Sequence, residues 1–146
     1  MGGSQKPRLI VGLSGSSGLP YGIRLLEVLR KLGTEEVHLC SMRTLSAINH
    51  SFADNLLVRA ADVTLKERRR LVVMPREAPL HTGQCKLLYE ASQLGVIVFP
   101  PMPTFYGRPG SIDDMVNTTI GRVLDLFGID AGLVKRWTGV AGKSKK

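Results

Sequence analysis

The apolar positions of this chain fall into two kinds of segment that alternate along the sequence. Short runs rich in β-branched residues predict strands, and longer segments with apolar residues every three or four positions predict amphipathic helices. The expected strands are Leu9–Leu13, Glu36–Cys40, Leu71–Met74 and Val96–Phe99. The expected helices are Tyr21–Leu32, one that begins within SMRTLSAINH, Asp54–Arg69, one that ends near Leu94, and one from Ser111 to Gly128.

Strands that alternate with helices predict an α/β fold, a parallel sheet with right-handed crossovers. Ligands of such sheets bind beyond the carboxyl ends of the strands. The residues that follow the expected strands are Ser14–Ser17, Ser41–Thr44, Arg76 with Glu77, and Met102–Tyr106. Hydroxyls, loop amides, an arginine, a carboxylate and a tyrosine suit a phosphorylated ligand and one acid/base group, and this set contains no metal cluster.

The first of these segments, RLIVGLSGSSGLPYG from Arg8 to Gly22, predicts a strand, a glycine-rich turn and a helix start. Pro20 suits the first turn of that helix, where unpaired backbone amides attract an anion. The spacing G-x-x-G-x-x-G departs from the dinucleotide fingerprint, and no Lys-Ser/Thr pair follows as in a Walker loop. An ordinary strand-to-helix turn without a ligand therefore stays an alternative.

Composition favours a single small globular domain. The chain has 146 residues, 43% of them hydrophobic, which predicts one domain over 8–137 between a flexible N-terminus, 1–7, and a basic disordered tail, 138–146. The formal charge of +8 falls to +5 without the three lysines of that tail, GKSKK. No aromatic-interleaved basic segment or zinc pattern accompanies this charge, so no nucleic-acid partner is expected.

Cysteine usage and the apolar runs bear on the compartment. Cys40 and Cys85 are too few for a disulfide framework, and no apolar run has the length of a membrane span. The first residues, MGGSQKP, have the features of neither a signal peptide nor a presequence. We therefore expect a cytoplasmic protein with no membrane partner, with a mitochondrial location left open.

Four segments together resemble the flavin prenyltransferases, the UbiX-type family that includes proteins called phenylacrylic acid decarboxylases. The resemblance extends over nearly the whole chain, from Arg8 to Trp137. The segments that carry it are RLIVGLSGSSGLPYGIRLLEVLR, CSMRTLSAI, RAADVTLKERRRLVVMPREAPL and FYGRPGSIDDMVNTTIGRVLDLFGI.

This resemblance implies a flavodoxin-like, Rossmann-like three-layer parallel sheet with helices on both faces. It also implies a homo-oligomer, a dodecamer in the family, with active sites shared between subunits. The implied reaction is metal-independent and transfers a dimethylallyl group from dimethylallyl phosphate to N5 and C6 of reduced FMN. The prenylated FMN then serves a UbiD-type decarboxylase.

The family's functional residues map onto matching positions of this chain. The implied FMN contacts are Ser14, Gly15, Ser16, Ser41, Met42, Arg43, Thr44 and Arg76. The residues implied to hold the prenyl phosphate are Lys66, Tyr106 and Arg122. The implied catalytic residues are Ser17, near the flavin N5, Glu77, which assists proton transfer, and Lys66, which stabilises charge on the leaving phosphate.

Ordinary structural roles remain open for several of these residues. Lys66 lies four residues after Asp62, a spacing typical of a surface ion pair on a helix. Arg122 shares a helix face with polar residues, Glu77 next to Arg76 suits a solvated pair, and Ser17 suits a turn cap. The three histidines, His38, His50 and His81, are expected to be structural or exposed.

One internal departure from the family pattern concerns the junction between Leu39 and Cys40. The family carries roughly fifty further residues there, the scale of a βαβ unit, and their loss predicts a reduced sheet. The alternative function is therefore a truncated, catalytically impaired FMN-binding or oligomer-forming remnant. A flavoprotein decarboxylase of peptidyl or pantothenoyl cysteine is less favoured, because the chain lacks a P-x-M-N-x-x-M-W-like segment.

Overall fold

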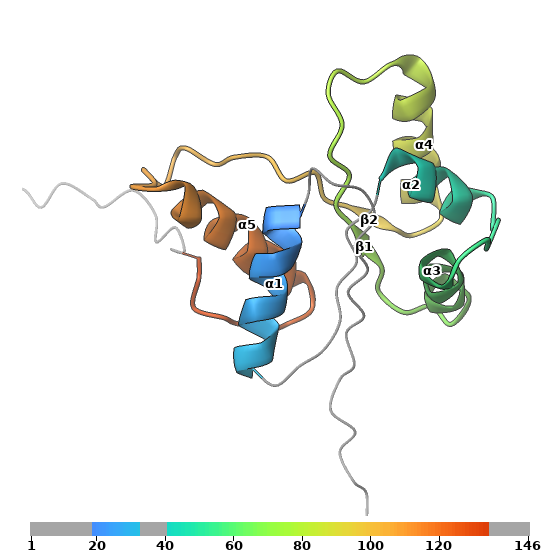
Figure 1. Ribbon diagram of the computed structural model, residues 1–146. Helices are drawn as coiled ribbons and strands as arrows, with labels where there is room; N and C mark the ends of the chain where they lie inside the picture. The colour runs from blue at the N-terminus through green and yellow to red at the C-terminus, as the bar shows by residue number, and fades with distance from the viewer. Residues whose placement is uncertain (1–18, 33–40, 135–146) are drawn as a thin grey trace, which may run out of the picture.

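The computed structural model describes residues 19–32 and 41–134 of the chain (Figure 1). Its elements, in order, are α1 (Leu19–Leu32), α2 (Met42–Asn49), α3 (Leu56–Lys66), β1 (Val72–Val73), α4 (Thr82–Gln93), β2 (Ile97–Val98) and α5 (Ile112–Leu126). Each helix and strand predicted within these two ranges is present. The predicted strands Leu9–Leu13 and Glu36–Cys40, the junction after Leu39 and the two predicted tails lie outside the described residues.

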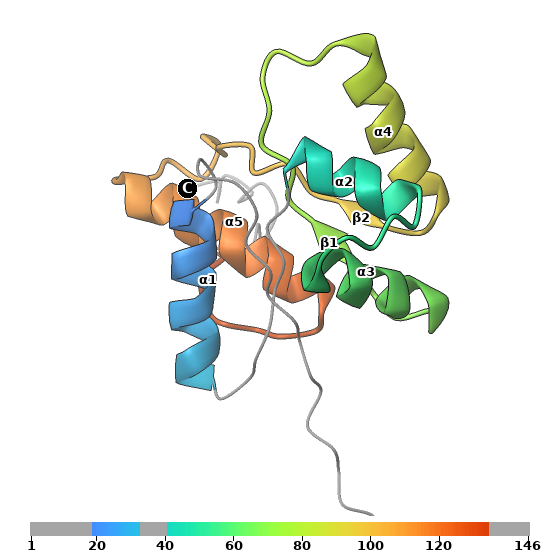
Figure 2. The ribbon, with the colours of Figure 1, turned by 45° about the vertical axis from the view of Figure 1, so that its right-hand side comes forward.

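Two parallel strands form the sheet of the described region. Val72 of β1 pairs with Ile97 of β2, and Val73 pairs with Val98. Successive side chains of a strand point to opposite faces, so Leu71 and Val73 join one buried cluster while Val72 joins another. Helices α2, α3 and α4 cover the first face, and α1 and α5 cover the second, as Figures 1 and 2 show. This three-layer α/β arrangement confirms the predicted fold class.

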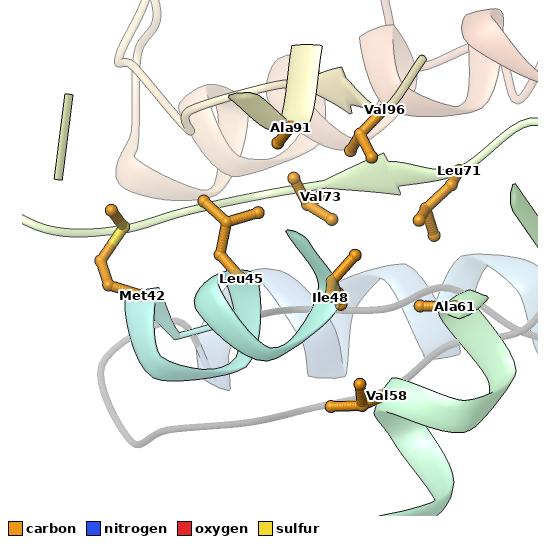
Figure 3. Packing of buried hydrophobic residues seen from close by; sticks show 9 residues of the cluster. All are labelled: Met42, Leu45, Ile48, Val58, Ala61, Leu71, Val73, Ala91 and Val96. Carbon is orange, nitrogen blue, oxygen red and sulfur yellow. The ribbon is translucent and has the colours of Figure 1, made fainter. Parts of the chain in front are cut away.

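The core of the first face is built from α2 and its neighbours (Figure 3). Leu45 and Ile48 of α2, three positions apart, point at the sheet because this spacing places them on one side of the helix. The buried residues of this cluster are Met42, Leu45, Ile48, Val58, Ala61, Leu71, Val73, Ala91 and Val96. Because this one cluster includes residues of α2, α3, α4 and the strand segments, it holds α2 against the sheet.

The second face is covered by a helix pair. Leu25 and Leu29 of α1 pack on Ile120 and Leu124 of α5, and all four are at most 1% exposed. The neighbouring residue Val123 of α5 packs instead on β1. Helix α5 thus contacts both α1 and the sheet, since Leu124 faces α1 and the adjacent Val123 faces β1.

The helix boundaries reflect local capping. Helix α3 is shorter than the predicted Asp54–Arg69, because Asn55 Oδ1 accepts from the Val58 amide at 3.0 Å and Arg68 adopts a positive φ of 56°. Ser111 begins α5 as predicted, accepting from the Asp114 amide at 3.1 Å. The Asp114 carboxylate accepts from the Gly110 amide, one residue earlier than in a capping box.

Among the helices described, none combines the length and apolarity needed to cross a membrane.

Candidate functional site

Three of the predicted ligand-binding segments meet at one edge of the sheet. The carboxyl ends of β1 and β2 lie at the same edge because the strands are parallel. Figure 3 shows Met42, Leu45 and Ile48 running opposite to the direction from Leu71 to Val73, so α2 begins at that edge. Ser41–Thr44, the residues after β1 and the loop after β2 are therefore neighbours, as the sequence predicts.

The start of α2 presents backbone amides and one cationic side chain. Ser41 Oγ accepts from the Thr44 amide at 3.3 Å and so caps the helix. Met42 and Thr44 are buried, and Arg43 is exposed and lines a hollow of about 410 Å³ with Thr44 and residues of the α2–α3 connection. The amides of Met42 and Arg43 have no acceptor one turn earlier in the helix. An anion here would meet those amides and the Arg43 guanidinium, whereas the Met42 side chain belongs to the core.

Arg76 and Glu77 lie in the loop after β1, separated from that strand by Met74 and Pro75, and both are exposed. Within residues 19–32 and 41–134, neither side chain takes part in a hydrogen bond or an ion pair, so the solvated Arg76–Glu77 pair does not form. Both groups are thus available to a ligand at the carboxyl edge.

Tyr106 lines a cavity of about 490 Å³ between the loop after β2, the first half of α5 and the segment that follows α5. This volume is typical of a small-molecule site. Its lining residues are Thr104, Tyr106, Gly107, Arg108, Pro109, Gly110, Asp114, Asn117, Thr118, Gly132 and Leu133. The phenol, the Arg108 guanidinium and the Asn117 amide give this cavity hydrogen-bond donors, which suits an anionic ligand.

The structure places the other two predicted phosphate ligands differently. Arg122 is exposed on α5, one turn beyond Thr118 on the same face, and so lies beside the Tyr106 cavity. Lys66 is the last residue of α3 and precedes β1, so it lies at the amino end of the strand that Arg76 follows. The Lys66–Asp62 ion pair does not form, because Asp62 pairs with Arg59 at 3.0 Å. Tyr106 thus lines the cavity and Arg122 lies one turn beyond its lining on α5, whereas Lys66 lies at the opposite edge of the sheet.

The remaining predicted site residues, Ser14, Gly15, Ser16 and Ser17, lie outside the described residues, as does His38. Of the two described histidines, His81 caps α4 through an imidazole nitrogen that accepts from the Gly83 amide at 3.1 Å. His50 makes a 2.8 Å contact from Nδ1 to the Ser46 carbonyl. Both side chains are exposed and make local contacts, in keeping with the expectation that they are structural or exposed.

Sequence reasoning missed a contact between α1 and α5. Arg24 Nε donates to Asn117 Oδ1 at 2.7 Å, and Asn117 lines the Tyr106 cavity. The two residues are 93 positions apart, so periodicity and local motifs carry no signal for the pair. Arg108, which also lines the cavity, was not predicted because it lies two residues beyond the candidate segment Met102–Tyr106.

Comparison with known proteins finds relatives that are named UbiX flavin prenyltransferases. The chain is 40% identical to the flavin prenyltransferase UbiX of Escherichia coli K12 over 186 residues, covering 90% of this chain and 98% of that protein. It is similar to a solved structure of AnUbiX (PadA1) in complex with FMN and dimethylallyl pyrophosphate, with a TM-score of 0.88 and 32% identity over 93% of this chain and 100% of the other.

A second solved structure, the dodecameric FMN-dependent UbiX-like decarboxylase of Escherichia coli O157:H7, has a TM-score of 0.83 and 34% identity. The match covers 91% of this chain and all of that one. No family model matches the chain.

The lengths of these matches bear on the predicted internal loss. The match to the Escherichia coli K12 protein spans 186 positions, whereas this chain has 146 residues, so at least 40 positions of the relative lack a counterpart here. These positions are internal, because a match begins and ends on paired residues. The shortening relative to the family is thereby confirmed, and its location after Leu39 stays a prediction.

Proposed function

Because the chain belongs to the UbiX family of flavin prenyltransferases, we propose that it transfers a dimethylallyl group from a phosphate ester to reduced FMN. The observation that carries this proposal is the extent of the likeness. The chain is 40% identical to a UbiX enzyme across 98% of that enzyme's length. Its carboxyl-edge residues have the donor chemistry that two phosphorylated substrates require.

The residues at the edge of the sheet fit FMN as the acceptor. The amides of Met42 and Arg43, which have no acceptor one turn earlier in the helix, and the Arg43 side chain suit a phosphate, because a helix start and a guanidinium both attract anions. Arg76 lies at the same edge and supplies a second cation. Ser14, Gly15, Ser16 and Ser17 complete this proposed FMN site. FMN supplies the nucleophilic ring positions of the reaction, and these residues hold it in place.

For the prenyl donor we assign Tyr106 and Arg122 as phosphate ligands. The phenol donates a hydrogen bond, and the guanidinium stabilises the charge that develops as the carbon–oxygen bond to phosphate breaks. Glu77, exposed after β1, carries a proton between substrate and solvent. Dimethylallyl phosphate is the proposed donor, and the pyrophosphate found with AnUbiX makes the diphosphate a necessary comparison.

We assign Lys66 to the active site of a neighbouring subunit. Within its own chain Lys66 lies at the amino end of β1, whereas Arg76 follows the carboxyl end. A shared site in a homo-oligomer reconciles these positions with a common role. A dodecameric relative of similar fold supports such an assembly.

The product of this reaction would serve a second protein. We propose a UbiD-type decarboxylase as the functional partner, since prenylated FMN is of use only to an enzyme that binds it. The proposed compartment is the cytoplasm, in keeping with a cysteine, Cys85, that is a free thiol in the structure.

The test is an anaerobic incubation of the purified full chain with FMN, a reductant and dimethylallyl phosphate. The expected product is a flavin whose mass has increased by one dimethylallyl group. A matched reaction uses a version of the chain with the family's missing internal stretch restored after Leu39. FMN binding without product by the natural chain, together with product from the restored version, would support the impaired remnant instead.

A further inference from the structure

Arg24 of α1 is fixed by hydrogen bonds on two sides. Its Nε donates to Asn117 Oδ1 of α5 at 2.7 Å, and its Nη1 donates to Glu27 Oε2, one turn along α1, at 2.8 Å. The Arg24 side chain is 35% exposed, and the helices beneath it are joined by the Leu25–Ile120 core. This arrangement holds the guanidinium in one place relative to α5.

The contact with Arg24 determines how the Asn117 amide is turned. A guanidinium only donates hydrogen bonds, so the acceptor must be the amide oxygen and not the nitrogen. The Asn117 Nδ2 group then occupies the other branch of the amide and retains two N–H donors. No partner for Nδ2 is found among residues 19–32 and 41–134.

Asn117 also lines the cavity of about 490 Å³ that contains Tyr106 and Arg108. The other polar groups of α5 at this cavity are already engaged. Thr118 donates to the Asp114 carbonyl at 2.8 Å, and the Asp114 carboxylate accepts from the Gly110 amide at 2.9 Å. Asn117 is therefore the residue of α5 that offers an uncommitted donor to a ligand in this cavity.

We propose that Asn117 Nδ2 donates a hydrogen bond to the phosphate of the prenyl donor, and that Arg24 is the positioning residue that turns the amide toward it. This inference rests on the proposed function and adds two residues to its substrate site. The position of α1 gives the contact a second consequence. Helix α1 begins at Leu19, directly after the predicted FMN turn, so the Arg24–Asn117 contact also links the two substrate sites.

The decisive variant is Asn117→Asp. The aspartate keeps the shape of the side chain and an oxygen for Arg24, but it removes the N–H donor and adds negative charge near the phosphate. We expect the KM for dimethylallyl phosphate to rise about ten- to a hundredfold, the effect of losing a hydrogen bond to a charged group. The kcat, the Kd for FMN and the melting temperature should stay near the parent values, because Asn117 is proposed to contact, of the two substrates, only the prenyl donor. If Asn117 had only a structural role, the variant would lower the melting temperature instead.

Arg24→Ala tests the positioning role. Without the guanidinium the Asn117 amide turns freely, so KM should rise by a smaller factor than in Asn117→Asp. Asn117→Asp should then raise KM by a smaller factor in the Arg24→Ala background than in the parent chain, since the effects of coupled residues are not additive. The matched control is Arg30→Ala, which removes an exposed arginine of α1 that has no partner among the described residues and should leave KM unchanged.

Calorimetric Kd values for dimethylallyl phosphate and dimethylallyl pyrophosphate, measured alongside turnover, separate the possible failures. If the parent chain makes no prenylated flavin and binds neither donor, the proposed function falls and this inference falls with it. If the parent binds a donor and Asn117→Asp binds it equally well, only the inference is overturned. A weaker Kd in Asn117→Asp, at an unchanged melting temperature, supports it whether or not the parent turns over.

Discussion

At the scale of single residues, Glu77 is the side chain whose chemistry can be isolated most simply. It is exposed and makes no ion pair within the described part of the chain, so replacing it disturbs no internal contact. Glu77→Gln keeps the size of the side chain and one acceptor oxygen but cannot carry a proton. We expect unchanged FMN binding, measured by flavin fluorescence, and a kcat about a hundredfold lower, as for a lost acid/base group.

The control for Glu77 is Glu90→Gln on α4, where the carboxylate lies 3.6 Å from Lys86 and away from the proposed site. This variant should keep the parent kcat. Loss of FMN binding in Glu77→Gln would assign Glu77 to the flavin site and remove it from proton transfer.

Gly121 lies where α5 meets the segment that follows it. A methyl group at this position would collide with Val134 Cγ2 and approach Leu133 Cβ to 3.1 Å. Gly121→Ala should therefore lower the free energy of unfolding by about 1–3 kcal/mol, as overpacking does, in a urea titration. Gly107→Ala, with nothing within 4 Å of the added carbon, is the control and should change stability by much less. Equal losses in both would mean that close packing is not the cause.

At the scale of elements, the sequence predicted which segments become helices or strands better than it predicted where they end. The apolar spacing of 54–69 located α3, but its first turn depends on whether Asp54 or Asn55 turns its side chain back onto the helix. Both residue types are good caps, so spacing does not choose between them. The imidazole of His81 capping α4 was likewise unexpected, because serine, threonine, asparagine and aspartate are the usual caps.

Ser111 lies where the sequence predicted that this helix begins, and its contribution as the cap of α5 can be measured. Ser111→Ala removes the acceptor of the Asp114 amide and should lower the free energy of unfolding by about 1 kcal/mol. The control is Ser92→Ala, an exposed serine within α4, which should be near neutral. Both are compared by urea denaturation. A Ser111→Ala variant as stable as the control would mean that solvent satisfies this amide equally well.

At the scale of the whole molecule, the alternation of strands and helices was enough to predict a parallel α/β sheet, and the resemblance to the family implied its three layers. Leu71, Val72, Val73 and Met74 each reach a buried cluster, which is why their run is continuously apolar. Sequence alone did not predict how α1 is tied to α5, since Arg24 and Asn117 meet only after the chain has folded. The resemblance to the family assigned Lys66 and Tyr106 to one phosphate site, and the structure adds that Lys66 lies at the amino end of β1 in its own chain.

That separation leads to a prediction about the assembly. Lys66→Ala and Tyr106→Phe should each have little activity as pure homo-oligomers, because each removes a phosphate ligand from every site. If a site combines Tyr106 of one chain with Lys66 of another, a mixed oligomer contains some sites with both native residues. Random mixing restores about one site in four, so co-expression of the two variants should recover about a quarter of the parent turnover per site.

The same experiment distinguishes a shared site from one built within a chain. If Lys66 and Tyr106 served the same chain's site, every site of a mixed oligomer would still lack one of them, and mixing would recover nothing. Native mass spectrometry shows whether mixed oligomers have formed, and Lys66→Ala co-expressed with itself gives the background. Mixed oligomers without recovered prenyl transfer would contradict the assignment of Lys66 to a neighbouring subunit. Recovery requires that the amino edge of one sheet, where α3 ends, lies against the carboxyl edge of the next.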